Sequence, residues 1–215
     1  KYLVRYEDAW PIPDTEYRKL YLNGESQSLI EDTVSVKSSL GYDAKTGNAS
    51  YTFTFDKDTE LSGNMKLRLW VSTSEGSDMD LFVGIKKLDN KGREVHFYAK
   101  TGFNKAPVAL GWLRVSQREL DSEKSTPWQP VLTHDNTQSI SEDQLVPVEI
   151  EILPSSTLFK KGESLQLIIQ GFDIFEHPTL AHKNTLNKGI HYIHSGGQYD
   201  SYLLVPVIPN RNIAN

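Results

Sequence analysis

The sequence predicts an all-β protein, a β-sandwich, and two observations support this fold class. Nearly every apolar segment alternates apolar and polar residues, which puts one set of side chains on the core face of a strand. No apolar stripe of helical period longer than two turns is visible. Strands with one apolar face each must close against one another, and two packed sheets achieve this.

The clearest alternation lies in Met65–Val71, where Met65, Leu67, Leu69 and Val71 point one way and the intervening residues the other. The segment Asp89–Gly92 has the composition of a hairpin turn between two strands. In chain order, the expected strands are Lys19–Leu22, Thr33–Lys37, Tyr51–Phe55, Met65–Val71, Leu81–Leu88, Glu94–Ala99, Leu110–Gln117, Val146–Ile152, Leu165–Gln170 and Ser201–Ile208.

Two long polar stretches, Glu119–Gln144 and Asp173–Tyr199, lack strand signals. Loops of this length are uncommon in compact domains, and they usually have a function or cover another part of the protein. They contain Trp128, Phe175 and Tyr192, which a fully solvated loop would not favour. We therefore expect a partner surface in these two loops.

Composition limits the class of protein. The chain has 215 residues, 38% of them hydrophobic and 24% charged, which suits one globular domain spanning residues 1–215. Its net charge of −5 shows no basic excess for nucleic acid, and no apolar run is long enough to cross a membrane. Cysteine is absent, which excludes thiol nucleophiles and cysteine-ligated metals. Because the first residue is Lys1 rather than Met, we expect a piece of a longer protein.

No motif for catalysis or for cofactor binding is visible. A serine hydrolase of the α/β type needs G-x-S-x-G, and the nearest segment, Gly162-Glu163-Ser164, continues with Leu165 and Gln166. The pair Lys45-Thr46 has no preceding glycine in the frame that a phosphate loop requires. The sequence therefore predicts no catalytic residue and no cofactor.

Four of the six histidines lie between His177 and His194. His191 and His194, together with His177 or His182, could bind a metal ion. In a strand, however, residues three apart face opposite sides, and no H-E-x-x-H pattern is present. We therefore favour hydrogen bonding within the loop and predict no metal site.

Two acidic residues, Asp78 and Asp80, lie two apart at a predicted strand entry. Paired carboxylates can hydrolyse glycosidic bonds, but the same face carries Phe82 and no obvious platform for a sugar. We favour solvation or salt bridges for this pair.

Four residues, Trp112, Arg114, Ser116 and Arg118, are expected on one strand face, opposite Leu113 and Val115. The two arginines are either solvated, or paired with carboxylates across the sheet, or in contact with a docked domain. We predict an Arg114–Asp80 or an Arg118–Asp78 contact.

Several motifs, in this order and spacing, resemble one protein family: Lys19–Leu22, Leu61–Gly63, Leu67–Ser72, Asp78–Phe82, Gly111–Arg118, Phe159–Gly162 and Leu203–Pro209. From about Trp10 to Pro209 the chain resembles the C-terminal domain of X-Pro dipeptidyl-peptidases and of CocE/NonD (cocaine esterase-like) hydrolases. The resemblance implies a galactose-binding-like jelly roll. It also implies a preceding α/β-hydrolase domain that holds the whole Ser, Asp and His triad, so that no catalytic residue transfers to this chain.

The resemblance implies a non-catalytic domain that packs on the hydrolase domain and helps to shape its active-site entrance. The loop Gly41–Gly47 is shorter than is usual in the family, which weakens any expectation that it contacts substrate. We expect a cytoplasmic parent protein that could form a homo-oligomer, and we leave its oligomeric state open. The candidates for the domain interface or for salt bridges are Asp78, Asp80, Trp112, Arg114, Arg118, Trp128 and Phe175.

Two other functions stay open. A carbohydrate-binding module is a common use of this fold, and Trp10, Trp70, Trp112 or Trp128 could stack on sugar rings. The sequence itself shows no cluster of aromatic residues with polar neighbours on one set of loops. A structural or adhesive sandwich domain is the third possibility, which the absence of an export signal makes less favoured.

Overall fold

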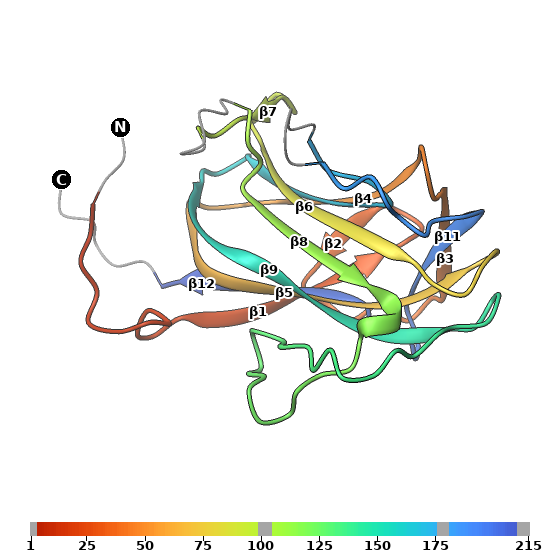
Figure 1. Ribbon diagram of the computed structural model, residues 1–215. Coiled ribbons are helices and arrows are strands. Elements are labelled where there is room, and N and C mark those ends of the chain that lie inside the picture. Colours follow the sequence, from red (N-terminus) through yellow and green to blue (C-terminus); the bar gives the residue numbers. More distant parts are fainter. Residues whose placement is uncertain (1–3, 99–104, 176–180, 210–215) are drawn as a thin grey trace.

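The structure is a computed structural model, and it describes residues 4–98, 105–175 and 181–209 (Figure 1). Within these ranges it is all-β, with one 3₁₀ turn, η1 (Val115–Gln117). The strands are β1 (Glu16–Asn23), β2 (Ser28–Ile30), β3 (Ser38–Asp43), β4 (Asn48–Thr54), β5 (Thr59–Thr73), β6 (Asp80–Leu88), β7 (Glu94–Val95), β8 (Ala109–Arg114), β9 (Val146–Phe159), β10 (Ser164–Gln170), β11 (Ile190–Ser195) and β12 (Tyr202–Ile208).

The strands form one closed, barrel-like sheet. Their order is β12-β1-β2-β4-β10-β6-β8-β9-β5, and β5 pairs in turn with β12 to complete the ring. The far end of β5 pairs with β11, which carries β3 at its other edge. The pairing between adjacent strands is short at two places in the ring. Strand β2 pairs with β4 only at Ser28↔Thr52, and β8 pairs with β9 only at Gly111↔Ile152.

The interior is filled by the alternating apolar side chains that the sequence shows. On β5, Leu67, Leu69 and Val71 are fully buried, and on β10 so are Leu165 and Leu167. Each buried side chain of this size contributes roughly 1.5–3 kcal/mol to folding. The core is therefore built from the inward-facing positions of strands around the whole ring.

Most of the predicted strands are confirmed, and several boundaries are wrong. Thr33–Lys37 is not a strand; the strand begins at Ser38 instead. Val36 is 53% exposed, so this β-branched segment has strand composition without burial to favour it. Only Glu94–Val95 of the predicted Glu94–Ala99 forms a strand, and Ala99 lies outside the described residues.

The predicted strand Leu110–Gln117 stops at Arg114, where the chain turns into η1. The carboxylate of Asp78 accepts a hydrogen bond of 2.8 Å from the backbone N–H of Ser116, which stabilises the turn. The stretch Asp173–Tyr199 was expected to lack strands, but it contains β11. In this strand Ile190, Tyr192 and His194 alternate with buried residues, and polar residues stand on both faces. A search for alternating apolar residues therefore does not find it.

The two long loops cover outer faces of the sheet. In the first, residues 119–144, the ring of Trp128 stacks on Tyr17 of β1 at 5.1 Å, and Gln129 donates a hydrogen bond of 2.8 Å to Glu151 of β9. This loop therefore runs under β9, β5 and β1 (Figure 1). In the segment after β10, Ile174 packs on β6, where a Cβ at Gly84 would lie 2.7 Å from its side chain.

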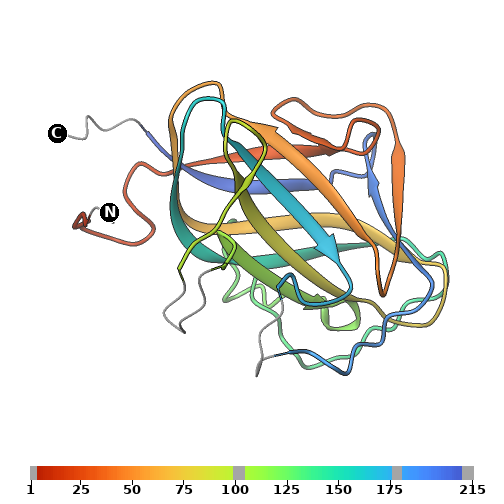
Figure 2. The ribbon, with the colours of Figure 1, turned by 90° about the horizontal axis from the view of Figure 1, so that it is seen from above.

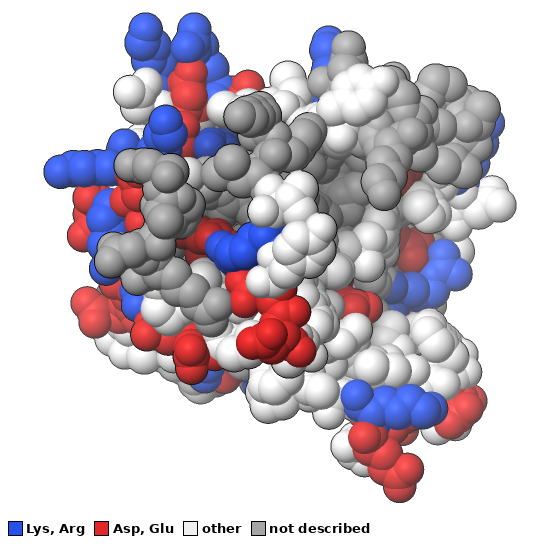
Figure 3. Space-filling view, turned by 90° about the vertical axis from the view of Figure 1, so that its left-hand side faces the viewer, with Lys and Arg blue, Asp and Glu red and all other residues white. Residues whose placement is uncertain are grey.

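Both ends of the described chain lie on the same side of the barrel (Figures 1 and 2). On that side, basic and acidic side chains are interspersed and no single sign dominates (Figure 3). Among the described residues, no helix has the length and apolarity that a membrane crossing requires.

Candidate functional site

The predicted contact between Arg114 and Asp80 is confirmed. These residues lie directly opposite each other on β8 and β6, and the guanidinium Nε and Nη2 donate to the two carboxylate oxygens at 2.7 and 3.0 Å. The hydrogen bond with Asp80 raises the pKa of Arg114 above its usual value. The same carboxylate, which is largely buried, also accepts the N–H of Leu186 at 2.7 Å. One acidic group thus joins two strands to the loop before β11.

The alternative contact, an ion pair between Arg118 and Asp78, is not formed within the described residues, and each side chain has another partner. Asp78 accepts from the backbone of Ser116, and Arg118 donates to the carbonyl of Gln138 at 2.5 Å. Ser116 is buried rather than on an outer face with Arg118, because the strand ends at Arg114. The prediction of a shared face therefore holds for Trp112 and Arg114 and is wrong for Ser116 and Arg118.

The sequence analysis did not find Asn187, whose buried side chain links β6 to the turn after β10 by hydrogen bonds. Its side chain is 3% exposed and makes three hydrogen bonds. Its Oδ1 accepts the N–H of Asp80 at 2.7 Å, and its Nδ2 donates to the carbonyls of Asp80 at 3.0 Å and Gly171 at 2.6 Å. A Cβ at Gly171 would lie 2.0 Å from the carbonyl oxygen of Ala44, so only glycine fits there. No periodic or motif signal marks an asparagine of this kind.

His191 and His194 point to opposite faces of the sheet, as predicted, but they lie on β11 rather than in a loop. His191 is fully buried, with its ring edge-on to Tyr42 at 5.5 Å. Burial lowers the pKa of His191 to about 4. His194 faces outward, where its Nε2 lies 2.9 Å from the hydroxyl oxygen of Ser72.

His182 is held by one carboxylate of its own covering segment. Asp173 accepts its backbone N–H at 2.8 Å and lies 2.8 Å from its Nδ1. The imidazole packs edge-on against Phe82 at 5.3 Å and lies 6.4 Å from the ring of Trp112. His177 is outside the described residues. Among those that are described, no group of three or more His, Asp or Glu residues could hold a metal ion.

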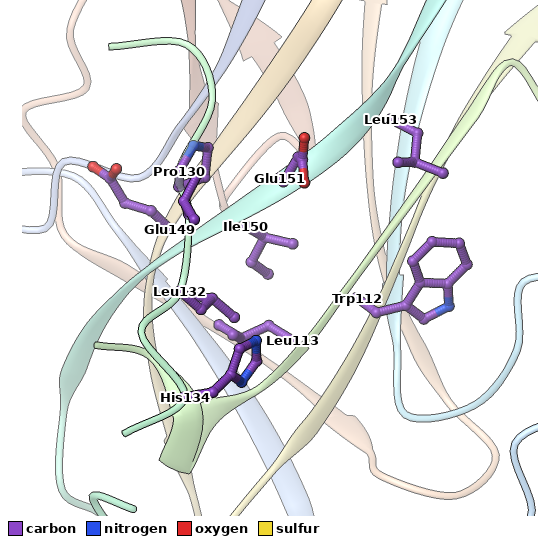
Figure 4. Close-up of a pocket in the computed structure, with 10 residues that line it drawn as sticks. Trp112, Leu113, Pro130, Leu132, His134, Glu149, Ile150, Glu151 and Leu153 are labelled. Carbon is purple, nitrogen blue, oxygen red and sulfur yellow. The ribbon is translucent and has the colours of Figure 1, made fainter. Parts of the chain in front are cut away.

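A groove of about 360 Å³ opens where β8 and β9 separate (Figure 4). The strands pair only at Gly111 and Ile152, and a Cβ at Gly111 would lie 2.3 Å from the carbonyl oxygen of Glu151. At one end of the groove stand Trp112 and Leu153, both exposed. Its lining residues are Trp112, Leu113, Pro130, Val131, Leu132, His134, Glu149, Ile150, Glu151 and Leu153.

The carboxylates of the groove already have partners. Glu149 pairs with Lys66 at 3.0 Å and with Arg68 at 3.4 Å, and Glu151 accepts from Gln129 at 2.8 Å. The groove is otherwise mostly apolar, and no nucleophile is paired with a base in it. Its lining therefore offers mainly apolar side chains to a molecule in contact with it.

The remaining interface candidates, Trp128 and Phe175, are both half-buried. Trp128 stacks on Tyr17 within this chain. A role at a domain interface remains a prediction for Asp78, Asp80, Trp112, Arg114, Arg118, Trp128 and Phe175.

An aromatic cluster that was not visible in the sequence lies across the far end of β5. The ring of Tyr199 is 5.6 Å from Trp70 and 5.7 Å from His194, and Tyr192 follows at 6.3 Å from His194. Beside it, Asp200 accepts the indole N–H of Trp70 at 2.9 Å. The members come from β5, β11 and the turn after β11, so only the sheet pairing brings them together.

Comparisons with known proteins identify a family. The model of the X-Pro dipeptidyl-peptidase C-terminal non-catalytic domain matches residues 3–204. A CocE/NonD family hydrolase from Staphylococcus aureus is 47% identical with a TM-score of 0.92, over 95% of this chain and 39% of that one. An aminopeptidase from a Thaumarchaeota archaeon has 15% identity and a TM-score of 0.68, over 94% of this chain and 38% of that one, and shows the fold alone.

A Mycobacterium bovis protein named "putative serine esterase" is 29% identical over 123 residues, which are 55% of this chain and 18% of that protein. The chain thus spans less than a fifth of this relative and about two fifths of the solved hydrolases. Because the family model covers nearly all of the sequence, the chain belongs to the X-Pro dipeptidyl-peptidase C-terminal non-catalytic domain family.

Proposed function

We propose that this domain packs on the α/β-hydrolase domain of a CocE/NonD or X-Pro dipeptidyl-peptidase type of serine hydrolase and helps to shape its active-site entrance. The observation that carries the proposal is the family match over residues 3–204, together with a 47% identical hydrolase in which the matching region is 39% of the chain. The missing nucleophile motif supports it, because the reaction then requires residues outside this sequence. A cytoplasmic location stays a prediction.

The internal bracing suits a supporting role. Asp80, Arg114 and Asn187 tie two strands to a covering loop through buried or bidentate hydrogen bonds, which keeps the outer surface in one arrangement. We also infer that the barrel is a flattened jelly roll of the galactose-binding type. The single-pair contacts of β2 with β4 and of β8 with β9 support this, because they divide the ring into two layers.

A chimera tests the proposal. In the S. aureus hydrolase, the matching C-terminal region is replaced by residues 4–209 of this chain, and the control protein ends before that region. We expect the chimera to retain ester hydrolysis within about tenfold of the parent, while the shortened protein loses thermal stability and activity. The 215-residue chain alone should hydrolyse neither an activated ester nor an X-Pro arylamide. A shortened protein as stable and active as its parent would contradict the proposal.

Carbohydrate binding is the second candidate, and the aromatic cluster favours it. Trp70, Tyr192 and Tyr199 are partly exposed aromatic side chains, and the Arg68–Asp200 pair at 3.0 Å lies beside them. Calorimetric titration with mono- and oligosaccharides tests it, with Trp70→Ala as the variant and Trp10→Ala, outside the cluster, as its control. Binding at millimolar concentration or below that Trp70→Ala abolishes would support this function, and no heat for any sugar would exclude it.

A further inference from the structure

The segment 4–11, which precedes β1 and is called the arm below, contains three large apolar side chains that are exposed. Val4 is 79% exposed, Tyr6 94% and Trp10 58%. Where exposed apolar side chains form a contiguous patch, they often mark a site of contact with another protein surface. In Figures 1 and 2 the arm leaves the barrel beside the end of β12 and lies apart from the sheet.

The arm is nevertheless anchored at two points. Near its start, the guanidinium of Arg5 donates to both carboxylate oxygens of Glu60 at 2.9 and 2.8 Å and also pairs with Glu7. Just after the arm, Ile12 is 7% exposed and belongs to the buried residues. The exposure of the apolar side chains therefore coexists with two fixed positions, Arg5 between Val4 and Tyr6, and Ile12 after Trp10.

In the arm, the charged side chain of Arg5 contacts the barrel, whereas the neighbouring apolar side chains are exposed. Arg5 reaches toward the barrel, while its neighbours Val4 and Tyr6 are the most exposed of the large apolar side chains among the described residues. Neighbouring residues of an extended chain point in opposite directions, which accounts for this separation. Polar contacts thus attach the arm to its own domain and leave the side chains of Val4 and Tyr6 exposed.

We propose that the exposed side chains of Val4, Tyr6 and Trp10 dock into an apolar surface of the α/β-hydrolase domain of the same polypeptide. This inference rests on the proposed function. The occupant follows from chain order, because the family is a C-terminal domain and the matched S. aureus chain has most of its length outside the match. The arm is the part of this domain that precedes β1, and it is therefore next in sequence to whatever comes before. Aromatic side chains such as Tyr and Trp are typical anchors of such contacts.

Thiol accessibility tests the docking directly, since the chain has no cysteine of its own. Tyr6→Cys and Trp10→Cys are prepared separately in the full-length hydrolase and in the isolated chain, and alkylation of the arm peptide is followed by mass spectrometry. Val36→Cys is the matched control, because Val36 is an apolar residue 53% exposed elsewhere on the surface. We expect the arm thiols to react at least about tenfold more slowly in the full-length protein, and the control at the same rate in both.

A second measurement keeps the test independent of labelling. Tyr6→Ser and Trp10→Ser should lower the Tm of the full-length protein by at least about 3 °C and leave the Tm of the isolated chain unchanged. Arm thiols that stay reactive, with an unchanged Tm, overturn the docking of the arm. If deleting the whole domain still impairs the hydrolase, the proposed function survives and another face is the interface; if deletion has no effect, the proposed function fails as well.

Discussion

Replacing Asn187 by alanine should be among the most damaging single changes in this domain. It removes three hydrogen bonds and leaves the N–H and C=O of Asp80 and the C=O of Gly171 without their partner in a buried place. Each buried polar group that loses its partner costs about 1–3 kcal/mol, and water entering the vacated space recovers part of this. We therefore expect the free energy of unfolding to fall by about 3–4 kcal/mol. For a domain of 215 residues this corresponds to a decrease in Tm of roughly 6–15 °C.

Urea unfolding followed by circular dichroism measures this loss, with Asn184→Ala as the control. Asn184 is exposed in the same loop, and its backbone carbonyl, rather than its side chain, accepts a hydrogen bond of 3.4 Å from Arg114. The control should change stability by less than about 0.5 kcal/mol. Asn187→Asp should be at least as damaging as the alanine variant, because a carboxylate cannot donate to the two carbonyls. Equal midpoints for Asn187→Ala and Asn184→Ala would refute the role of Asn187 in linking β6 to the turn after β10.

Three further changes have defined outcomes. Burial lowers the pKa of His191 to about 4 from an ordinary value of 6.5, so on acidification the unfolded chain binds the proton before the folded one does. The contribution of His191 to the free energy of unfolding is therefore complete above pH 6.5 and falls by roughly 3 kcal/mol toward pH 4. In urea titrations at several pH values, His191→Leu should flatten this dependence of stability on pH. Gly111→Ala would place its Cβ 2.3 Å from the carbonyl oxygen of Glu151 and should cost about 1–3 kcal/mol; an unchanged urea midpoint would mean that β8 and β9 separate without cost. Trp128→Ala removes the stacking on Tyr17 and should speed proteolysis within residues 119–144, whereas unchanged cleavage would show that the other loop contacts suffice.

Periodicity was enough to predict the all-β class and most strands, because each strand buries one face. It failed where burial and composition disagree. Thr33–Lys37 has strand composition without burial, while β11 alternates buried positions with the partly polar residues Tyr192 and His194. Strand ends were also misplaced where a side chain ends the strand, as Asp78 does by stabilising the turn after Arg114.

The site was predictable where it depends on cross-strand neighbours. Asp80 and Arg114 carry opposite charges near the ends of two strands, and antiparallel pairing brings them opposite each other. Asn187 could not be found in this way, because its partners are backbone groups of β6 and of the turn after β10. The aromatic cluster around Trp70 was missed because it exists only after β5 and β11 pair.

A large apolar residue in a loop has three physical explanations, and a sequence does not separate them. It covers the protein's own sheet, as Trp128 does on Tyr17 and Ile174 on Gly84, or it contacts a partner, or it stays exposed to solvent. The first explanation accounts for these loop residues by packing within the chain. It does not account for Tyr6, which is 94% exposed on an arm that an ion pair fixes to the barrel. Since burying such a side chain stabilises a protein by roughly 1.5–3 kcal/mol, the proposed docking of the arm would account for its exposure.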